Sequence, residues 1–504
     1  MSGRTARPRR DAGGRARRPA PTRIEDPQGA GLAALDATAQ ADLVRRGELT
    51  PAELAEAALR RIEAADPALG ALAVPLFEAG LAQARSPALP PGPFRGVPFL
   101  MKDVGATQAG QPYYAGNRAL RDADYRTSAD SYLGARFRQA GLVTLGKSKT
   151  PEFGLQSTTQ PLAFGPTRNP WDPDRSAGGS SGGACAAVAA GLVPIAHAND
   201  GAGSIRIPAS WCGVVGLKPS RGRVALEPTS VSRADVGFAV ARSLRDLATL
   251  LDAVHGQEPG DLFRVPPPAR PFAEEIAAAP GALRVGFLAH LPGATTHPEC
   301  ARAVESAAQL LSELGHRVEA SAPEALFEEE RALTRLGFGP VAYRLCLRAL
   351  SRILGRFARA EDVEPFLWEL ADPLGPPTRA EDFVEAETWE QGWAVRVASW
   401  WARGFDLLLT PTVAEPAVPL SALDPHTHSP EELLARMAPH MAFTEPFNVT
   451  GQPALSLPLH WTPDGLPVGV QLVARVGRED LLLRVGAQLE AARPWAARRP
   501  PLRA

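Results

Sequence analysis

The spacing of apolar residues along this chain changes between a helical period and short continuous runs, which predicts alternating helices and strands. Residues 50–66 are the clearest helix, because Thr50 can cap it, Pro51 suits its first turn and Glu53 completes a capping box. One apolar stripe follows at helical spacing: Leu54, Ala58 and Ile62. We expect Pro67 to end this helix.

Short apolar runs border loops rich in glycine and serine in the first half of the chain. Residues 96–104, with a strand that ends at Lys102, and residues 141–148 are typical of buried strands. Residues 184–194 have small side chains on every side, so they predict a short buried helix closed by Gly191 and Pro194.

The second half repeats this alternation. We expect a strand near 283, a helix opening at Pro298, and a strand at 317–321. Residues 325–402 favour helices, and we expect their Trp393–Trp401 cluster to be core. Apolar strands return at 405–411, 454–459 and 467–474, before a last helix at about 479–492. The pattern predicts an α/β fold.

Composition excludes several classes of protein. The 504 residues include 54 basic and 55 acidic side chains, so we expect no nucleic-acid partner and no membrane-surface binding. No run of 18 apolar residues predicts a membrane span. Four scattered cysteines without a CxxC pair are typical of reduced thiols in a cytoplasmic protein, and no histidine spacing indicates zinc. We expect no metal and no cofactor; the oligomeric state stays open, a homodimer included.

The first residues differ from the rest. Residues 1–23 contain eight arginines and one acid, Asp11, with no large apolar residue after Met1. We therefore predict that residues 1–31 form a disordered basic tail and that residues 32–504 form one large domain.

Residues 141–148, GLVTLGKS, fit the letters of a phosphate-binding loop, but their physical character does not. The variable positions are Leu, Val, Thr and Leu, which favour a buried strand over a flexible loop. Pro151 also follows where the required helix would begin. We interpret this match as accidental.

Two glycine-rich loops carry serines that could cleave an amide. The segment AGGSSGG contains Ser180 and Ser181, and NDGAGS places Ser204 directly after Gly201, Ala202 and Gly203. Amide cleavage by serine needs a base and backbone donors for the oxyanion, and small residues let backbone amides converge on one oxygen. Lys102, at the end of a buried strand, could be that base if burial keeps its amine neutral.

These motifs resemble the amidase signature family. The resemblance is close from 96 to about 225, in GVPFLMKD, TPEFG, FGPTRNPWDP, AGGSSGG, GSIRIPAS and CGVVGLKPSRGR, and it continues weakly to PVGVQLVA. The stretch HANDGAGSIRIPAS is most similar to the branch that contains 6-aminohexanoate cyclic-dimer hydrolase. The resemblance implies an amidase signature fold: a mixed central sheet covered by helices on both faces, with specificity set by residues from about 225 to 450.

The resemblance also implies a Ser-cisSer-Lys triad. It makes Lys102 the base, Ser180 the bridging serine on a cis peptide bond, and Ser204 the nucleophile that forms an acyl-enzyme. The oxyanion or substrate would then contact Gly201, Ala202, Gly203 and Ser181. The implied partner is a small linear or cyclic amide.

Residues beside the motifs have structural interpretations. We expect Asp103 to support the loop after Lys102, and Asp200 and Arg206 to form an ion pair without a catalytic proton role. Cys185 and Cys212 are predicted to be buried core thiols rather than nucleophiles.

Two positions depart from the family pattern. Ala202 stands where many members have glycine, which is compatible with a negative φ but would narrow the acyl pocket. Lys149 stands where the family typically has asparagine, so its hydrogen bonds cannot be inferred from the resemblance.

Two other functions compete with a stand-alone amidase. One is the amidase-type subunit of a glutamyl-tRNA(Gln) amidotransferase, but that subunit typically carries glutamine where this chain has Ile207. The other is a silent binding module, which predicts loss of Lys102, Ser180 or Ser204. All three are present.

Overall fold

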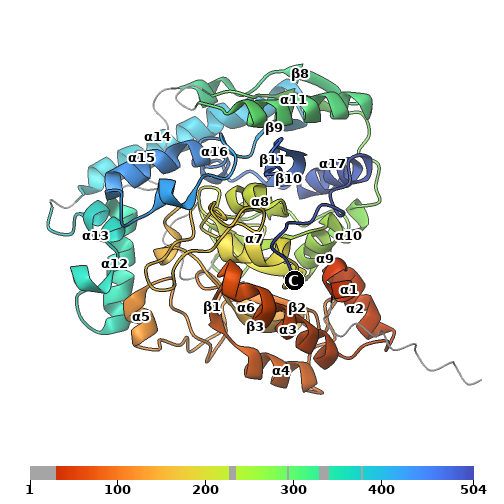
Figure 1. The fold of residues 1–504 in the computed structure, drawn as a ribbon. Helices are drawn as coiled ribbons and strands as arrows, with labels where there is room; N and C mark the ends of the chain where they lie inside the picture. The colour runs from red at the N-terminus through yellow and green to blue at the C-terminus, as the bar shows by residue number, and fades with distance from the viewer. Residues whose placement is uncertain (1–29, 226–233, 292–294, 329–339, 376–377) are drawn as a thin grey trace, which may run out of the picture.

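A computed structural model describes residues 30–225, 234–291, 295–328, 340–375 and 378–504. Its centre is a sheet of 11 strands in the order β1-β3-β2-β4-β6-β5-β10-β11-β9-β7-β8 (Figure 1). The strands are β1 Leu72–Pro75, β2 Pro98–Lys102, β3 Val143–Ser148, β4 Ile195–Asp200, β5 Val215–Lys218, β6 Val236–Ala241, β7 Arg284–Phe287, β8 Arg317–Ala320, β9 Leu407–Pro411, β10 Ala454–Trp461 and β11 Pro467–Ala474. Parallel and antiparallel pairs both occur, as between β2 and β4 and between β4 and β6. The predicted α/β fold with a mixed sheet is confirmed.

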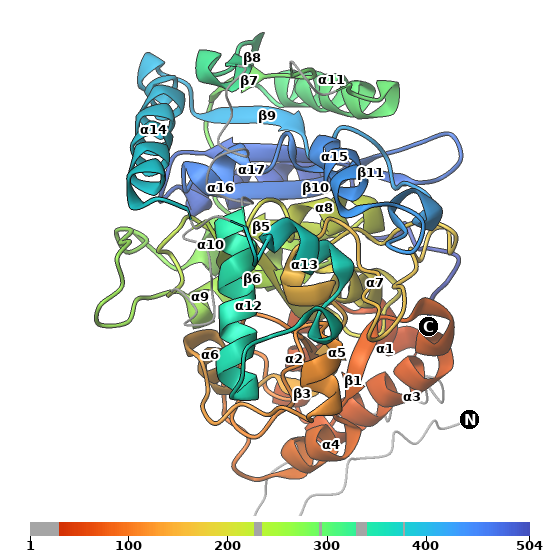
Figure 2. The ribbon, with the colours of Figure 1, turned by 90° about the vertical axis from the view of Figure 1, so that its left-hand side faces the viewer.

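Helices cover the sheet along its length. The strands around the middle pack against α3 (Pro51–Leu69), α7 (Gly182–Ala189), α8 (Arg206–Cys212) and α9 (Leu244–Val254). Beyond them, α11 (Pro298–Glu313) and α17 (Glu479–Ala492) pack on β9, β10 and β11. Figure 2 shows this stack from the side, with α4 (Phe77–Arg85) at the β1 end and α11 at the β8 end.

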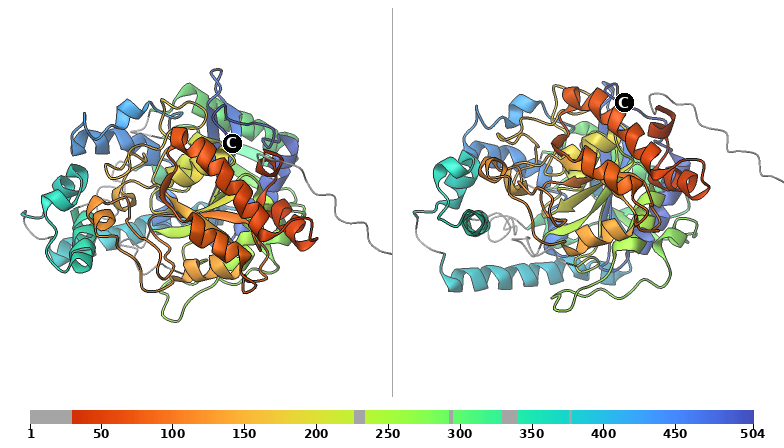
Figure 3. Two further views of the ribbon diagram at one scale, coloured as in Figure 1. Left: turned by 60° about the horizontal axis from the view of Figure 1, so that its bottom comes forward. Right: turned by 90° about the horizontal axis from the view of Figure 1, so that it is seen from below.

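The helical region of the second half lies to one side of the sheet. It comprises α12 (Pro340–Leu354), α13 (Pro365–Ala371) and α14 (Ala380–Ser399), which stand apart from the strands in Figure 3. Trp393, Trp400 and Trp401 are 1% exposed each and belong to one buried cluster, so the prediction that they are core is confirmed. The parts of the predicted helical region at 329–339 and 376–377 lie outside the described residues.

The predicted start of α3 is confirmed and its predicted end is wrong. Thr50 and Glu53 form the reciprocal capping box with Pro51 in the first turn. The helix runs through Pro67 to Leu69 and ends at Gly70, which adopts a left-handed φ of 65°. A proline in the last turn removes one hydrogen bond only, whereas the glycine supplies the conformation that closes a helix.

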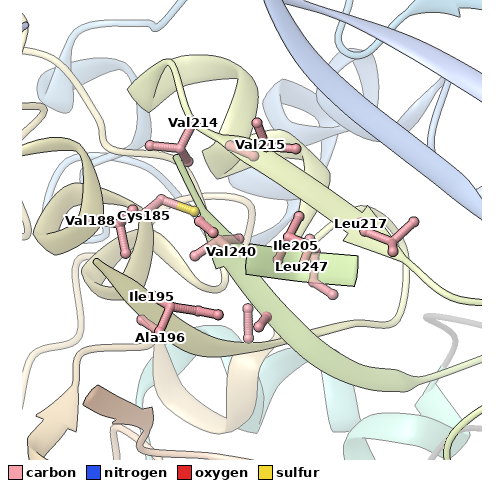
Figure 4. Close-up of a cluster of buried hydrophobic side chains, with 14 of the residues drawn as sticks. Cys185, Val188, Ile195, Ala196, Ile205, Val214, Val215, Leu217, Val240 and Leu247 are labelled. Carbon is pink, nitrogen blue, oxygen red and sulfur yellow. The ribbon is translucent and has the colours of Figure 1, made fainter. Parts of the chain in front are cut away.

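The small-residue helix α7 is completely buried, as predicted. Cys185 and Val188 pack there against side chains of β4, β5 and β6 (Figure 4). Side chains this small let α7 lie close to the sheet, and α7 therefore fixes the serine loop that precedes it.

The remaining helices and short helical turns complete the path of the chain. They are α1 Ala30–Ala34, α2 Ala37–Arg45, α5 Arg118–Asp122, α6 Tyr132–Gln139, α10 Phe272–Glu275, α15 Pro430–Met441, α16 Pro446–Val449, η1 Glu152–Gly154, η2 Glu324–Phe327, η4 Ala360–Asp362, η5 Trp401–Arg403 and η6 Leu420–Leu423. In the described part of the chain, no helix combines the length and hydropathy that crossing a membrane requires. The predicted basic tail lies, apart from its last two residues, outside the described residues.

Candidate active site

The predicted site residues meet at one edge of the sheet. Parallel strands β2 and β4 end there with Lys102 and Asp200, and Ser204 lies in the loop that β4 enters. The other serine loop immediately precedes α7, and its Ser181 amide donates a hydrogen bond to the carbonyl oxygen of Ser204 over 3.3 Å. The structure thus brings both serine loops together beside Lys102.

The amine of Lys102 is enclosed by hydrogen-bonding groups and has no exposure to solvent. Its Nζ lies 2.7 Å from Ser180 Oγ and 2.9 Å from Ser181 Oγ. It also donates a hydrogen bond to the side-chain oxygen of Asn199. The peptide bond between Gly179 and Ser180 is cis.

Burial gives Lys102 the protonation behaviour of a base. Desolvation lowers its pKa from the ordinary lysine value to about 7, against the opposing charges of Asp235 and Asp200. A large fraction of the amine is therefore neutral near pH 7. The backbone N–H of Lys102 donates to His197 Nδ1 over 3.2 Å, and burial holds the pKa of this histidine well below its usual range.

The loop after β4 is held by a buried ion pair, as predicted. Arg206 donates two hydrogen bonds of 2.9 Å to the carboxylate of Asp200. That carboxylate also accepts the backbone N–H groups of Gly203, over 2.6 Å, and Ile205, over 3.1 Å. Burial alone would raise the pKa of Asp200, but the charge and hydrogen bonds of Arg206 outweigh it and lower the pKa to about 2.

Gly203 and Ala202 occupy this loop for different reasons. Gly203 has a φ of 135°, and an added Cβ would lie 2.3 Å from Thr444 Oγ1. Ala202 has no positive φ, so the alanine fits the backbone as expected. Its carbonyl oxygen accepts a hydrogen bond of 2.6 Å from Thr444 Oγ1.

Two further neighbours have structural contacts. Asp103 is buried and accepts the backbone N–H groups of Tyr114 and Gly116, which confirms its predicted support of this loop. Lys149 donates to the carbonyl oxygens of Phe164 and Gly165, so this departure from the family pattern is satisfied by a neighbouring loop.

Buried lysine is general in this protein. The chain has four lysines, and none is more than 7% exposed: Lys102, Lys147, Lys149 and Lys218. The four cysteines are free and buried, and burial raises the pKa of Cys185 and Cys212. Both are core thiols, as predicted.

The phosphate-loop match at 141–148 is a strand. Residues Val143–Ser148 form β3, every one of them buried, and a 3₁₀ turn with a left-handed Phe153 follows instead of a helix. In the described residues, no group of three His, Cys, Asp or Glu side chains is arranged to hold a metal ion.

Asn199 and Asp235 are contacts of the site that sequence reasoning missed. Asn199 lies inside the quoted loop motif, but nothing in its residue type distinguished it from a structural asparagine. Asp235 comes from a separate segment, which the antiparallel pairing of β4 with β6 places beside Asn199. Both border a cavity of about 500 Å³, partly open to solvent, whose walls also include His197, Arg221 and Phe263.

Comparison with known proteins decides the family. The family model described as Amidase matches residues 53–483. The chain belongs to the amidase signature family. As an amidase, it is a hydrolase that acts on amides.

Other comparisons show which amidases this one resembles. It is 45% identical to the 6-aminohexanoate-cyclic-dimer hydrolase of Pseudomonas sp. (strain NK87), over 93% of this chain and 96% of that protein. A solved structure of 6-aminohexanoate cyclic dimer hydrolase complexed with substrate aligns with a TM-score of 0.87 and 43% identity, over 93% of this chain and 99% of the other. The corresponding component of the glutamyl-tRNA(Gln) amidotransferase from Thermotoga maritima aligns with a TM-score of 0.71 and 26% identity, over 92% and 96%. The predicted resemblance to the cyclic-dimer branch is confirmed.

Proposed function

We propose that this amidase hydrolyses small linear or cyclic amides through an acyl-enzyme on Ser204. Ser204 Oγ attacks the amide carbonyl carbon and passes its proton to Ser180, which passes its own proton to Lys102. The same chain of groups returns a proton to the leaving amine. Water then attacks the acyl-enzyme by the same route and releases the acid.

The position of Lys102 carries this proposal. A fully buried amine with a pKa of about 7 lies 2.7 Å from the hydroxyl of Ser180, and the adjoining serine binds the backbone of Ser204. A base that works near neutral pH combines the right protonation state with a useful driving force.

The loop from Gly201 to Ser204 would stabilise the oxyanion. The amide of Gly203 already donates to Asp200, so we assign it to holding the loop in place. The amides of Gly201 and Ala202 are then the proposed donors to the developing negative charge.

The proposal extends to the substrate. The substrate class follows from the amidase relatives, and we place its specificity in residues 225–450. Ile207 supports a stand-alone enzyme, since it is 1% exposed and packs beside Gly203 at the position where the amidotransferase protein would have glutamine. Free buried cysteines agree with a cytoplasmic location.

Turnover by the purified chain alone tests this function. We expect it to release an amine or ammonia from a panel that includes linear and cyclic oligoamides, without partner proteins. A fluorophosphonate probe should label Ser204 and leave the Ser204→Ala variant unlabelled. An isolated chain that is inert toward every amide, but becomes a glutaminase with amidotransferase partners, would instead establish the amidotransferase function. Labelling at Ser148, Ser220 or a cysteine would overturn the assignment of the nucleophile.

A further inference from the structure

The orientation of the Asn199 side chain is fixed by two neighbours. Its Nδ2 lies 3.2 Å from each carboxylate oxygen of Asp235, and its Oδ1 faces Lys102 Nζ. A carboxylate can only accept hydrogen bonds, so the N–H end of the amide must face Asp235. The amide oxygen is therefore presented to Lys102, from which it takes one N–H.

Ser181 takes a second N–H from the same amine. Its hydroxyl donates to the carbonyl oxygen of Asn199 over 3.3 Å, so its oxygen is left to accept from Lys102 Nζ at 2.9 Å. A neutral amine has two N–H groups and one lone pair. With both N–H groups used, the lone pair points to the third neighbour, Ser180 Oγ, at 2.7 Å.

We propose that Asn199, held by Asp235, is a positioning residue that aims the lone pair of Lys102 at Ser180. This inference rests on the proposed function, because it gives Lys102 the role of base. Rotation about the Cε–Nζ bond would otherwise let the amine present an N–H to Ser180, which cannot remove a proton. Asp235 acts on the orientation of the amine through Asn199.

The charges around Lys102 make the proposal measurable by pH. Asp235 stabilises the ammonium form and so raises the pKa of Lys102 against the larger effect of burial. The other ionisable groups that act on the amine are Asp200 and Cys185, while His197 is kept neutral by burial. Changing the charge at Asp235 or Asn199 should thus move the acid limb of the kcat/KM profile, whereas a merely structural contact would not.

Two charge changes of opposite sign test the proposal. Asp235→Asn keeps the shape, removes the anion and lets either end of the Asn199 amide face Lys102, so we expect kcat to fall ~10-fold and the acid limb to move to lower pH. Asn199→Asp adds an anion beside the amine, so its acid limb should move to higher pH. Asn199→Ala should lower kcat by ~100-fold with a smaller change in KM. Asp235 is partly exposed, so Asp235→Asn is expected to fold.

Asp261→Asn is the matched control. Asp261 lines the same cavity, but its carboxylate accepts the backbone N–H of Glu258 instead. We expect this variant to keep the wild-type kcat and acid limb.

Lys102→Ala separates failure of this inference from failure of the proposed function. If Lys102→Ala is inactive while Asp235→Asn and Asn199→Ala stay within twofold of wild type with unmoved acid limbs, the positioning role is wrong and the lysine base stands. If Lys102→Ala keeps more than about a tenth of the wild-type rate, a loss below ~1.4 kcal/mol, both are wrong. Equal shifts in the Asp261→Asn control would also overturn the role of Asp235.

Discussion

Arg206 and Asp200 form a two-bond ion pair in which neither side chain has any exposure to solvent. The guanidinium also donates to the carbonyl oxygen of Thr444 and to Gln471 Oε1, over 2.8 and 2.7 Å. The pair therefore ties the loop that carries Ser204 to segments far along the chain, which reach it only through the fold.

Neutralising Asp200 should destabilise the protein and its serine loop together. Asp200→Asn leaves the buried Arg206 charge without a partner, for which we expect a loss of ~3–5 kcal/mol in the free energy of unfolding. Urea denaturation measures this change. The control is Arg396→Ala, which breaks an exposed pair with Glu328 and should cost ~1 kcal/mol or less. Equal losses in the two variants would contradict the importance given to the buried pair.

Activity should fall on the acid side of neutrality. Only neutral Lys102 can accept a proton, and its pKa is about 7, so protonation removes the base as the pH drops. We expect kcat/KM to decline about tenfold per pH unit well below pH 7 and to level off above it. A profile that stays flat down to pH 5 on a chemistry-limited substrate would argue against Lys102 as the base.

Gly203 should tolerate no side chain, in contrast to its neighbour Gly201. In Gly203→Ala the new Cβ meets Thr444 Oγ1 at 2.3 Å and Ile207 Cδ1 at 2.7 Å, at a φ that alanine avoids. In Gly201→Ala the nearest atom is 3.9 Å away. We expect a melting temperature lowered by several degrees for the first variant and little changed for the second. Two equal melting temperatures would show that the loop relaxes freely.

A buried pair of carboxyl groups should make stability depend on pH. Burial raises the pKa of Glu364 to about 7, and burial together with Glu364 raises the pKa of Glu152 well above its usual range. Because the folded-state pKa of Glu364 exceeds the unfolded value, ionisation costs stability as the pH rises from about 4.5 to 7. Glu364→Gln removes this cost, so its gain in stability over wild type should grow to ~2–3 kcal/mol between pH 5 and pH 8.

Thermal denaturation across this pH range measures the gain. The exposed Glu361, changed to glutamine, is the control and should show no growth with pH. A Glu364→Gln advantage that is constant or shrinks with rising pH would contradict the assigned protonation.

Local signals made much of the fold predictable. The capping box at Thr50, the strand ending at Lys102 and the all-small helix after Ser181 each depend on near neighbours in sequence, and each occurs in the structure. The end of α3 was missed because a proline near a helix terminus costs little, so Gly70 decides the boundary.

The candidate site divides in the same way. Ser180, Ser181 and Ser204 could be named because glycine-rich loops and family motifs mark them. Asn199 and Asp235 could not, since their significance comes from a strand pairing that sets Asn199 opposite Gly237. No periodicity within either segment reports that pairing, which depends on the packing of the whole sheet.

The burial of all four lysines has a consequence for handling the enzyme. Its surface cations are arginines, which do not react with succinimidyl esters or glutaraldehyde as primary amines do. Reagents of this kind should therefore leave the lysine side chains of the folded enzyme unmodified, and conjugation or immobilisation through them would require unfolding. Carboxyl-directed coupling offers a route to a support that leaves the Lys102 amine intact.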